Sequence, residues 1–369
     1  MNEDKSTRYH RLRRRAAVVS LGVEALVLGG LIVTGASVAL REMAVGLAGG
    51  RPVLVVPVYV ALLAAIHEIV VLPIGVSRGL LLERRFGLSR ETLGGWARDH
   101  AKAVALGFAF GLAGASVVYA LMRAAPGWWW VAAATVFAAA AVVLTQLAPV
   151  LLLPLFYRLT PLRNEALGAR LVDLATRAGS DVLGVYEWHL GDRTRRANAA
   201  LVGLGRTRRI LVSDTLLAEY SDEEIEAVLA HELGHHVHRD LWTAVAYEGA
   251  LVFAGFYSAD RALAWLGPAM GLDGPADVAG LPLLLVASGL VSLVLVPVAN
   301  ALSRWHERRA DRFALFLTGR PAAFVSAMRR LAAQNLAEEA PSRIVRILFH
   351  SHPPIRERIA AAAAFQPSR

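Results

Sequence analysis

Six long apolar runs constrain the fold of this chain more than any other feature of its sequence. A helix needs about 20 mostly apolar residues to cross a bilayer core. The predicted spans are 16–40, 52–76, 103–122, 128–156, 241–266 and 281–302. The first run is too long for a signal peptide, and no small-residue cleavage site follows it, so we expect it to remain as an anchor. The sequence therefore predicts a mainly α-helical, multi-span membrane protein with six transmembrane helices, or seven if the long fourth run is broken near a proline.

Composition supports this class and excludes several others. Of the 369 residues, 56% are hydrophobic and 19% are charged, whereas soluble domains carry about 25% charged residues. The chain has no cysteine, so any metal must be held by histidines and carboxylates. The net charge of +9 does not indicate a nucleic-acid partner, because the basic residues gather at the ends of apolar runs.

The distribution of arginine predicts the orientation in the membrane. Basic residues are frequent before the first span, between the second and third, and after the fourth and sixth spans, and they are scarce in the other loops. Segments rich in lysine and arginine stay on the cytoplasmic side. We therefore expect an inner or plasma membrane protein whose N- and C-termini are cytoplasmic, together with segments 157–240 and 303–369.

The spans divide the chain into four parts. Residues 1–156 form an N-terminal membrane domain of about four spans, 157–240 the first half of a soluble domain, 241–302 two further spans, and 303–369 the second half. We expect this soluble domain to be of the α+β class.

Within 157–240, the pattern predicts helices and strands. Residues 160–179 have apolar residues at helical spacing and end in glycine. Residues 182–188 are typical of a strand, and 198–214 of a hairpin that turns at "GRTR". A further helix begins at Ser221, because Glu224 follows three residues later and completes a capping box.

This last helix carries the stretch "VLAHELGHHVHRD". His231 and His235 are four residues apart, so both imidazoles lie on one helix face, where a single metal ion can bind them. Glu232 is about 100° further around the helix, which suits a general base beside a metal-bound water. Gly234 leaves room for the close approach of a neighbouring backbone or of substrate. The alternative is a helix that simply carries surface histidines.

Two other histidines in the stretch fit a metal less well. His236 faces away from the stripe of His231 and His235, and we interpret it as a packing or surface residue. His238 returns to that stripe, but it lies about 10.5 Å along the axis from His231. One ion cannot bind both on a straight helix, so the third ligand should come from elsewhere in the chain.

The stretch "SRWHERRADRFA", just after the sixth span, offers that ligand. Glu307 would complete a site with two histidines and one glutamate, leaving the fourth position for water. Asp311, four residues later, would then hydrogen-bond a ligand imidazole and fix its tautomer. His306 is a weaker rival for the third ligand, and a salt-bridged juxtamembrane helix is the alternative without a metal.

Several motifs together resemble the zinc-dependent type I CAAX prenyl protease family and related bacterial membrane metallopeptidases of the gluzincin type. They are "HELGH", "SRWHERRADRFA", "HSHPPIRERI", "LERRFGLSRETLGGW", "LPLFYRLTPL" and "NAALVGLGRTRRILVSDTLL". The resemblance covers about residues 70–360. It implies a cytoplasmic gluzincin-type protease domain that holds one Zn²⁺ per chain.

The resemblance also implies roles for single residues. Those that match the family are His231, His235 and Glu307 as zinc ligands, Glu232 as catalytic base, Asp311 as supporting carboxylate, His352 and Arg358 as groups that stabilise the oxyanion and bind substrate, and Asn198 with Ala199 as the strand edge that pairs with an extended substrate. A cationic His and Arg near a metal would stabilise an oxyanion electrostatically. The alternative for "HSHPPIRERI" is a proline-rich turn followed by a basic helix.

These observations predict an integral membrane zinc metalloendopeptidase that acts on membrane-associated or CAAX-like peptides. The expected partners are a peptide or protein substrate and the lipid bilayer, with no obligate protein partner. The Ala- and Arg-rich composition is typical of a bacterial chain, which makes a quality-control protease of the heat-shock type an alternative to a prenyl-peptide protease. A transporter or channel with a regulatory metal site is an alternative of another class, because Glu24, His67, Glu68 and Glu248 fall within spans. A catalytically inactive scaffold is a third.

Overall fold

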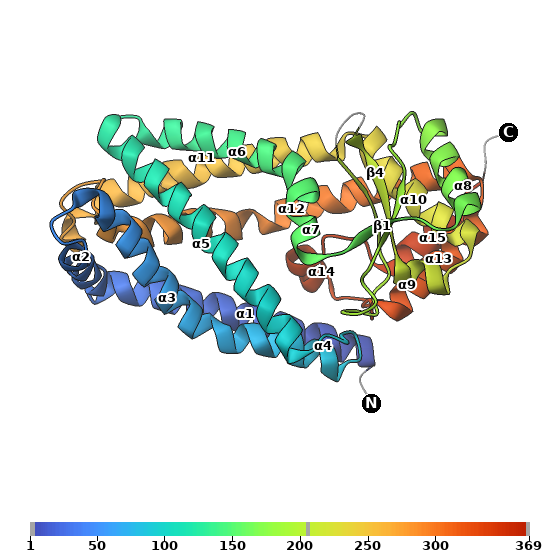
Figure 1. Cartoon of the computed structure of the whole chain (residues 1–369), viewed down its shortest axis with the longest axis horizontal. Coiled ribbons are helices and arrows are strands. Elements are labelled where there is room, and N and C mark those ends of the chain that lie inside the picture. Colours follow the sequence, from blue (N-terminus) through green and yellow to red (C-terminus); the bar gives the residue numbers. More distant parts are fainter. Residues whose placement is uncertain (1–3, 204–206, 367–369) are drawn as a thin grey trace.

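The computed structural model describes residues 4–203 and 207–366. Long helices extend from one end of an elongated molecule, and a small sheet with its own helices lies at the other (Figure 1). The long helices are α1 (Lys5–Val33), α3 (Val55–Val76), α5 (Leu93–Ala124), α6 (Trp129–Leu151), α11 (Asp240–Leu266) and α12 (Leu281–Thr318). Shorter helices between them are α2 (Ala36–Leu47), α4 (Leu82–Arg85) and α7 (Leu153–Phe156). This arrangement confirms the predicted mainly α-helical membrane protein with an added α+β domain.

Within the described part of the chain, five helical segments are long and apolar enough to cross a membrane. They are Lys5–Val33, Pro52–Arg85, Leu93–Ala124, Trp129–Leu151 and Val278–Thr318. The fifth predicted span, 241–266, also forms a helix, α11, which packs along α6 and α12. It is less apolar than the five, since Glu248, Asp260 and Arg261 interrupt it.

Two predicted spans have different limits in the structure. The first, 16–40, is broken because α1 ends at Val33 and Gly35 adopts a left-handed conformation with φ of 72° before α2 begins. Glycine allows this turn without a steric penalty. The fourth, 128–156, ends as a helix at Leu151, and α7 then starts afresh with Pro154 in its first turn. The prolines of the fourth run indicate its break near Pro154. No such signal marks the break of the first run, because the residues on both sides of Gly35 stay apolar.

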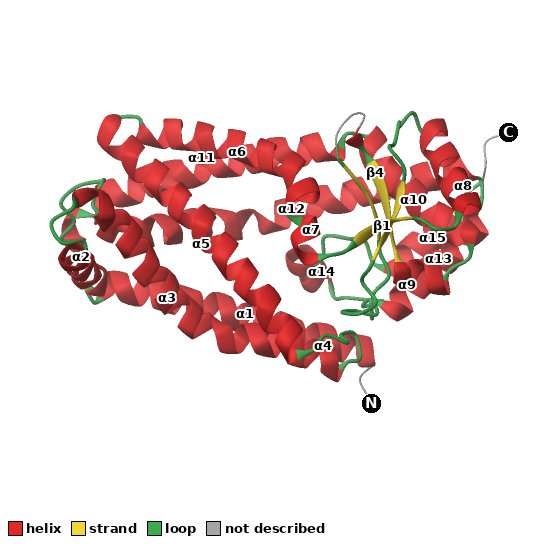
Figure 2. Ribbon diagram, in the orientation of Figure 1, coloured by secondary structure: helices red, strands yellow, loops and turns green. Residues whose placement is uncertain are grey.

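The soluble domain contains a mixed four-stranded sheet (Figure 2). Its strands are β1 (Leu159–Pro161), β2 (Val185–Trp188), β3 (Ala199–Val202) and β4 (Arg209–Ser213), in the order β1-β2-β4-β3. β2 and β4 are parallel, whereas β1 pairs antiparallel with β2 and β3 pairs antiparallel with β4. The predicted hairpin is therefore present as β3 and β4, although residues 204–206 of its turn lie outside the described residues.

The predicted helix at 160–179 is wrong at its beginning. Thr160 and Pro161 belong to β1, and the helix α8 starts at Glu165 and ends at Arg177. Asn164 caps it, because the Asn164 side chain accepts a hydrogen bond from the backbone N–H of Leu167. The apolar spacing alone did not locate this start.

The segments before and after α11 and α12 share one hydrophobic core. Helices α8, α9 (Asp214–Glu219), α10 (Asp222–Val237), α13 (Pro321–Gln334), α14 (Arg343–Phe349) and α15 (Ile355–Ala363) belong to this region of the fold. Leu171 of α8, Ile210 of β4, Leu229 of α10 and Phe324 of α13 are buried together with the end of α12. The chain segments on both sides of the helix pair α11 and α12 therefore pack together in one region of the fold.

Candidate metal centre

Helix α10 carries the histidine-rich stretch, and its start lies where the sequence predicts it. The backbone N–H of Glu224 donates to Ser221 Oγ at 3.3 Å, and the backbone N–H of Ser221 donates to Glu224 Oε2 at 2.9 Å. The predicted capping box is therefore confirmed. Because the helix start is fixed in this way, the positions of His231 and His235 one turn apart near its end are fixed as well.

Helix α12 continues without interruption from the membrane into the soluble domain and carries Glu307 and Asp311 one turn apart. It packs against α10 at Gly234. A Cβ atom at Gly234 would lie 2.9 Å from Ala310 Cα and 3.1 Å from Ala310 O. The role predicted for Gly234, room for a neighbouring backbone, is thus confirmed, and α12 is that neighbour.

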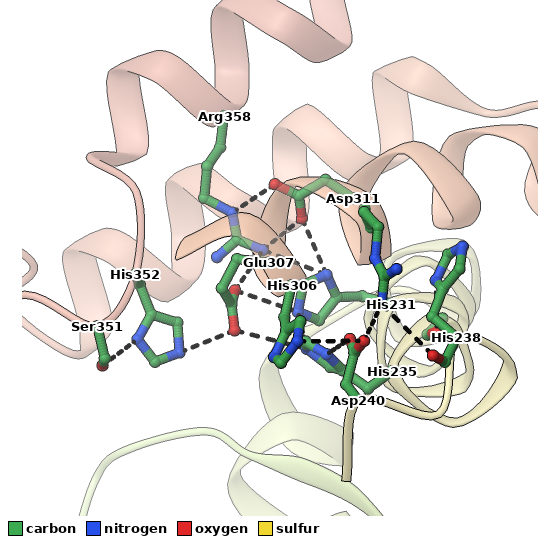
Figure 3. A network of polar contacts seen from close by, with 12 residues as sticks. His231, His235, His238, Asp240, His306, Glu307, Asp311, Ser351, His352 and Arg358 are labelled. Carbon is green, nitrogen blue, oxygen red and sulfur yellow. Dashed lines mark hydrogen bonds and ion pairs between the residues drawn. The ribbon is translucent and has the colours of Figure 1, made fainter. Parts of the chain in front are cut away.

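Three side chains predicted as metal ligands meet at this contact (Figure 3). The Nε2 atoms of His231 and His235 are 3.3 Å apart. Glu307 Oε2 lies 3.4 Å from His231 Nε2, and Glu307 Oε1 lies 3.5 Å from His235 Nε2. One ligand atom from each residue falls within 4.8 Å of the other two.

The donor set fits a metal ion. Ligand atoms on a tetrahedral zinc at 2.0–2.1 Å are about 3.3 Å from one another, which matches the observed separations. Glu307 is only 6% exposed, and its Oε2 atom is buried without a hydrogen-bond partner among the described residues. A buried carboxylate oxygen without a partner is costly, and a cation at this point would satisfy it.

A carboxylate contacts the Nδ1 atom of His231, and an arginine binds that carboxylate. Asp311 Oδ1 lies 2.9 Å from His231 Nδ1, the contact predicted for Asp311. Arg358 donates to both oxygens of Asp311, from Nε at 2.8 Å and from Nη2 at 2.5 Å. Burial alone would lower the pKa of His231, but the neighbouring carboxylates of Asp311 and Glu307 outweigh it and raise that pKa to about 9.

The other ligand candidate, His235, has a carboxylate partner that the sequence reasoning missed. Asp240 Oδ2 lies 2.9 Å from His235 Nδ1. Asp240 is the first residue of α11 and comes after a sharp turn at Arg239. The only available signal was an acidic residue five positions after the second histidine, and helical spacing cannot relate residues across such a turn.

Glu232, the predicted base, lies half-buried beside the cluster. Burial raises its pKa above the ordinary value, while the nearby charges of His231 and His235 oppose that shift. A raised pKa suits a carboxylate that must take up and release a proton.

His352 and Arg358 approach Glu307 from the segment after α14. His352 Nε2 lies 3.2 Å from Glu307 Oε1, and the His352 side chain is 62% exposed. Arg358 Nη2 lies 3.6 Å from Glu307 Oε2, and the Arg358 side chain is only 11% exposed. His352 is therefore accessible to solvent at the cluster, whereas Arg358 supplies a positive charge that is largely shielded from solvent.

The other histidines of the two motifs, His236, His238 and His306, lie outside the cluster. His238 Nδ1 is 2.8 Å from Gly234 O, and its ring packs on Phe313. His306 Nε2 is 2.8 Å from Thr243 Oγ1, so it is engaged elsewhere. His236 is half-buried, and burial lowers its pKa.

The strand β3 lies at one edge of the sheet and packs beside α10. The backbone N–H of Ser213 donates to Asn198 O at 2.9 Å, and the backbone N–H of Asn198 donates to Ser213 Oγ at 2.9 Å. Asn198 thus points its backbone groups toward β4. Because direction alternates along a strand, Ala199 and Leu201 point theirs toward the free edge.

Known protein families match nearly the whole chain. Residues 161–366 match "Peptidase family M48", and residues 2–158 match "CAAX prenyl protease N-terminal, five membrane helices". The metalloprotease YhfN of Bacillus subtilis is 30% identical over 308 residues, which are 82% of this chain and 72% of the relative. The CAAX prenyl protease 1 of Saccharomyces cerevisiae is 26% identical over 332 residues, 82% of this chain and 71% of the relative. The protease HtpX of Hahella chejuensis is 28% identical over 219 residues, 52% of this chain and 69% of the relative.

A solved structure has the same fold. The crystal structure of S. mikatae Ste24p matches with a TM-score of 0.84 and 23% identity, and the match covers 97% of this chain and 87% of the other. The family match extends over the soluble domain, in which α10 and the end of α12 bring the two histidines and Glu307 together. The chain therefore belongs to peptidase family M48 and is a multi-pass membrane metalloprotease.

Proposed function

We propose that this protein is a zinc endopeptidase in which His231, His235 and Glu307 hold one Zn²⁺. The observation that carries the proposal is the convergence of these three side chains within 4.8 Å, with Glu232 beside them. When bound, zinc lowers the pKa of a water in its open coordination position toward 7. The family membership favours hydrolysis over the transporter and inactive-scaffold alternatives.

Each of the chain's own residues has a defined task in this proposal. Glu232 accepts a proton from the attacking water and then gives it to the leaving amine. His352 and Arg358 stabilise the negative charge that develops on the carbonyl oxygen of the peptide. Asp311 orients His231 through its Nδ1 atom, and Arg358 holds Asp311 in place.

The substrate would be an extended peptide that adds to the free edge of β3. Ala199 and Leu201 offer outward N–H and C=O groups for this pairing, and the exposed Asn198 side chain lies at its start. Backbone pairing of this kind recognises an extended chain with little demand on side chains. It supports a peptidase with broad sequence tolerance along this strand.

The membrane would select among such peptides. In our proposal the termini and the metal centre face the cytoplasm, and residues 1–156 and 241–302 hold the two catalytic segments, 157–240 and 303–369, at the bilayer surface. Substrates would then be membrane-associated or membrane-proximal peptides. Matches to both a CAAX prenyl protease and the protease HtpX support testing a CAAX-like tail and an unfolded membrane protein as the two substrate types.

The test uses the purified full chain in lipid nanodiscs. After chelation and removal of metal, zinc is added back, and hydrolysis is followed for one peptide sequence supplied in soluble form and in a lipid-anchored form. We expect no cleavage without metal, recovery at one zinc per chain, and faster cleavage of the anchored peptide. Full activity in the chelated protein would contradict the zinc assignment, and equal rates for both peptide forms would contradict the membrane-associated substrate.

A further inference from the structure

Asp240 lies at the centre of a buried polar network behind His235 (Figure 3). It is only 5% exposed. Its Oδ2 atom faces His235 Nδ1 at 2.9 Å, and its Oδ1 atom is bound by Arg309 Nη2. His306 Nε2 lies 3.7 Å from Oδ1 as well. Both carboxylate oxygens therefore have charged or polar partners, and one partner belongs to the proposed metal centre.

The contact with Asp240 determines which ring nitrogen of His235 has a lone pair available for a metal. An ionised carboxylate only accepts hydrogen bonds, so His235 Nδ1 must carry the proton that Asp240 accepts. The Nε2 atom then keeps its lone pair, and it is the atom that lies 3.5 Å from Glu307 Oε1. The contact with Asp240 thus selects the tautomer and ring orientation that a metal requires.

Backbone geometry brings Asp240 to this position. Arg239, the last residue before α11, adopts φ of 57° and ψ of 36°, a left-handed conformation that is uncommon for residues other than glycine. The chain therefore turns sharply after α10, and the first residue of α11 points back at the histidine five positions earlier. Thr243 supports the turn, because its hydroxyl donates to Asp240 O at 2.9 Å.

The two histidines consequently have matching supports from different helices. His231 is backed by Asp311 of α12, which Arg358 of α15 binds. His235 is backed by Asp240 of α11, which Arg309 of α12 binds. Arg309 is itself held in place, since its guanidinium lies 3.9 Å from the centre of the Trp305 ring.

We propose that Asp240, held by Arg309, is a positioning residue for His235 and ties the geometry of the metal centre to the packing of the membrane helices α11 and α12. This inference rests on the proposed function, because it requires His235 to bind a metal. Helix α11 would then contribute to the metal centre as well as to the bundle of long helices. Its first residue orients one of the three ligands.

The test measures zinc affinity of the full chain by competition with a chromophoric chelator, for wild type, Asp240→Asn, Asp240→Ala and Arg309→Gln. Loss of such a supporting partner weakens metal affinity by about 10–100-fold. We expect a loss in this range for Asp240→Ala, and smaller losses for Asp240→Asn, which keeps an acceptor oxygen, and for Arg309→Gln. The matched control is Asp260→Asn on the same helix, whose carboxylate binds Trp129 Nε1 instead. It should keep wild-type affinity.

Cobalt substitution adds a readout that a purely structural role does not change. The visible absorption of bound Co²⁺ reports ligand geometry, so Asp240→Ala should shift these bands while Asp260→Asn leaves them in place. Wild-type affinity and an unchanged cobalt spectrum in Asp240→Ala would overturn the inference while leaving the zinc site intact. A wild-type protein that binds no zinc would instead overturn the proposed function, and this inference with it.

Discussion

The backbones of Gly234 in α10 and Ala310 in α12 approach so closely that a Cβ atom at Gly234 would lie 2.9 Å from Ala310 Cα. The two helices carry all three proposed ligands. Along α10 the contact falls between His231 and His235, and along α12 it falls between Glu307 and Asp311. A side chain at 234 would separate the helices. The spacing of 3.3–3.5 Å among the ligand atoms therefore depends on the absence of a single methyl group.

Replacing Gly234 by alanine tests this dependence. The added methyl group meets backbone atoms that cannot move aside, and overpacking of this kind costs about 1–3 kcal/mol. We expect Gly234→Ala to lower the melting temperature and to weaken zinc binding. Gly168→Ala in α8 is the control, because its new Cβ would lie 3.8 Å from Leu162 Cδ2, an ordinary contact. That variant should be as stable as wild type or slightly more so.

The identity of the third ligand predicts a second set of variants. Glu307→Ala should lose bound zinc, whereas His238→Ala and His306→Ala should retain it, since both histidines are engaged outside the cluster. Zinc at 100 times its Kd stabilises a folded protein by about 2.7 kcal/mol. The melting temperature should therefore rise with zinc in the two histidine variants but not in Glu307→Ala. Retained zinc in Glu307→Ala would disprove this ligand.

The free edge of β3 predicts a third result. Leu201→Pro removes an outward N–H without removing a bond to β4, and one hydrogen bond contributes about 0.5–1.5 kcal/mol. We expect kcat/KM for a peptide to fall two- to tenfold beyond the effect of Leu201→Ala, which removes the same side chain but keeps the N–H. Equal values for the two variants would show that substrate does not pair with this strand.

A histidine at the junction with α1 predicts a pH dependence of stability. His350 contacts Glu338, which in turn pairs with Arg14 of α1. Burial lowers the pKa of His350 below its ordinary value of 6.5, although Glu338 opposes the shift. A depressed pKa means that the folded state resists protonation, so the stability present above pH 6.5 is lost as pH falls. The drop in melting temperature between pH 7.5 and 5.5 should be smaller in His350→Gln than in wild type.

Regular helical spacing was enough to predict which residues of the candidate site lie together on two helices. Four-residue spacing placed His231 with His235 and Glu307 with Asp311, and the capping box placed the start of α10. The role of Asp240 was not predicted, because its position depends on the left-handed turn at Arg239 and no periodic pattern continues through such a turn. Its contact with His235 became visible only in three dimensions.

The limits of the predicted elements were less accurate for a related reason. Hydropathy identified the membrane runs, and the prolines of the fourth run indicated its restart near Pro154. The break at Gly35 was not predicted, because the chain turns there while staying apolar. The helix predicted from 160 began with a strand, because the short β1 is set by its pairing with β2 and not by its own sequence. Elements that depend on distant partners are the ones that local patterns miss.

The central claim is that Glu232 activates a water at a zinc site built by α10 and α12. Its most direct test is peptide cleavage by wild-type protein and Glu232→Gln, each adjusted to the same measured zinc content of one per chain. The account predicts cleavage by the wild type and a loss of at least about 100-fold in kcat for the variant, since general base catalysis contributes 10²–10⁴-fold. Equal cleavage by both proteins at equal zinc content would contradict it.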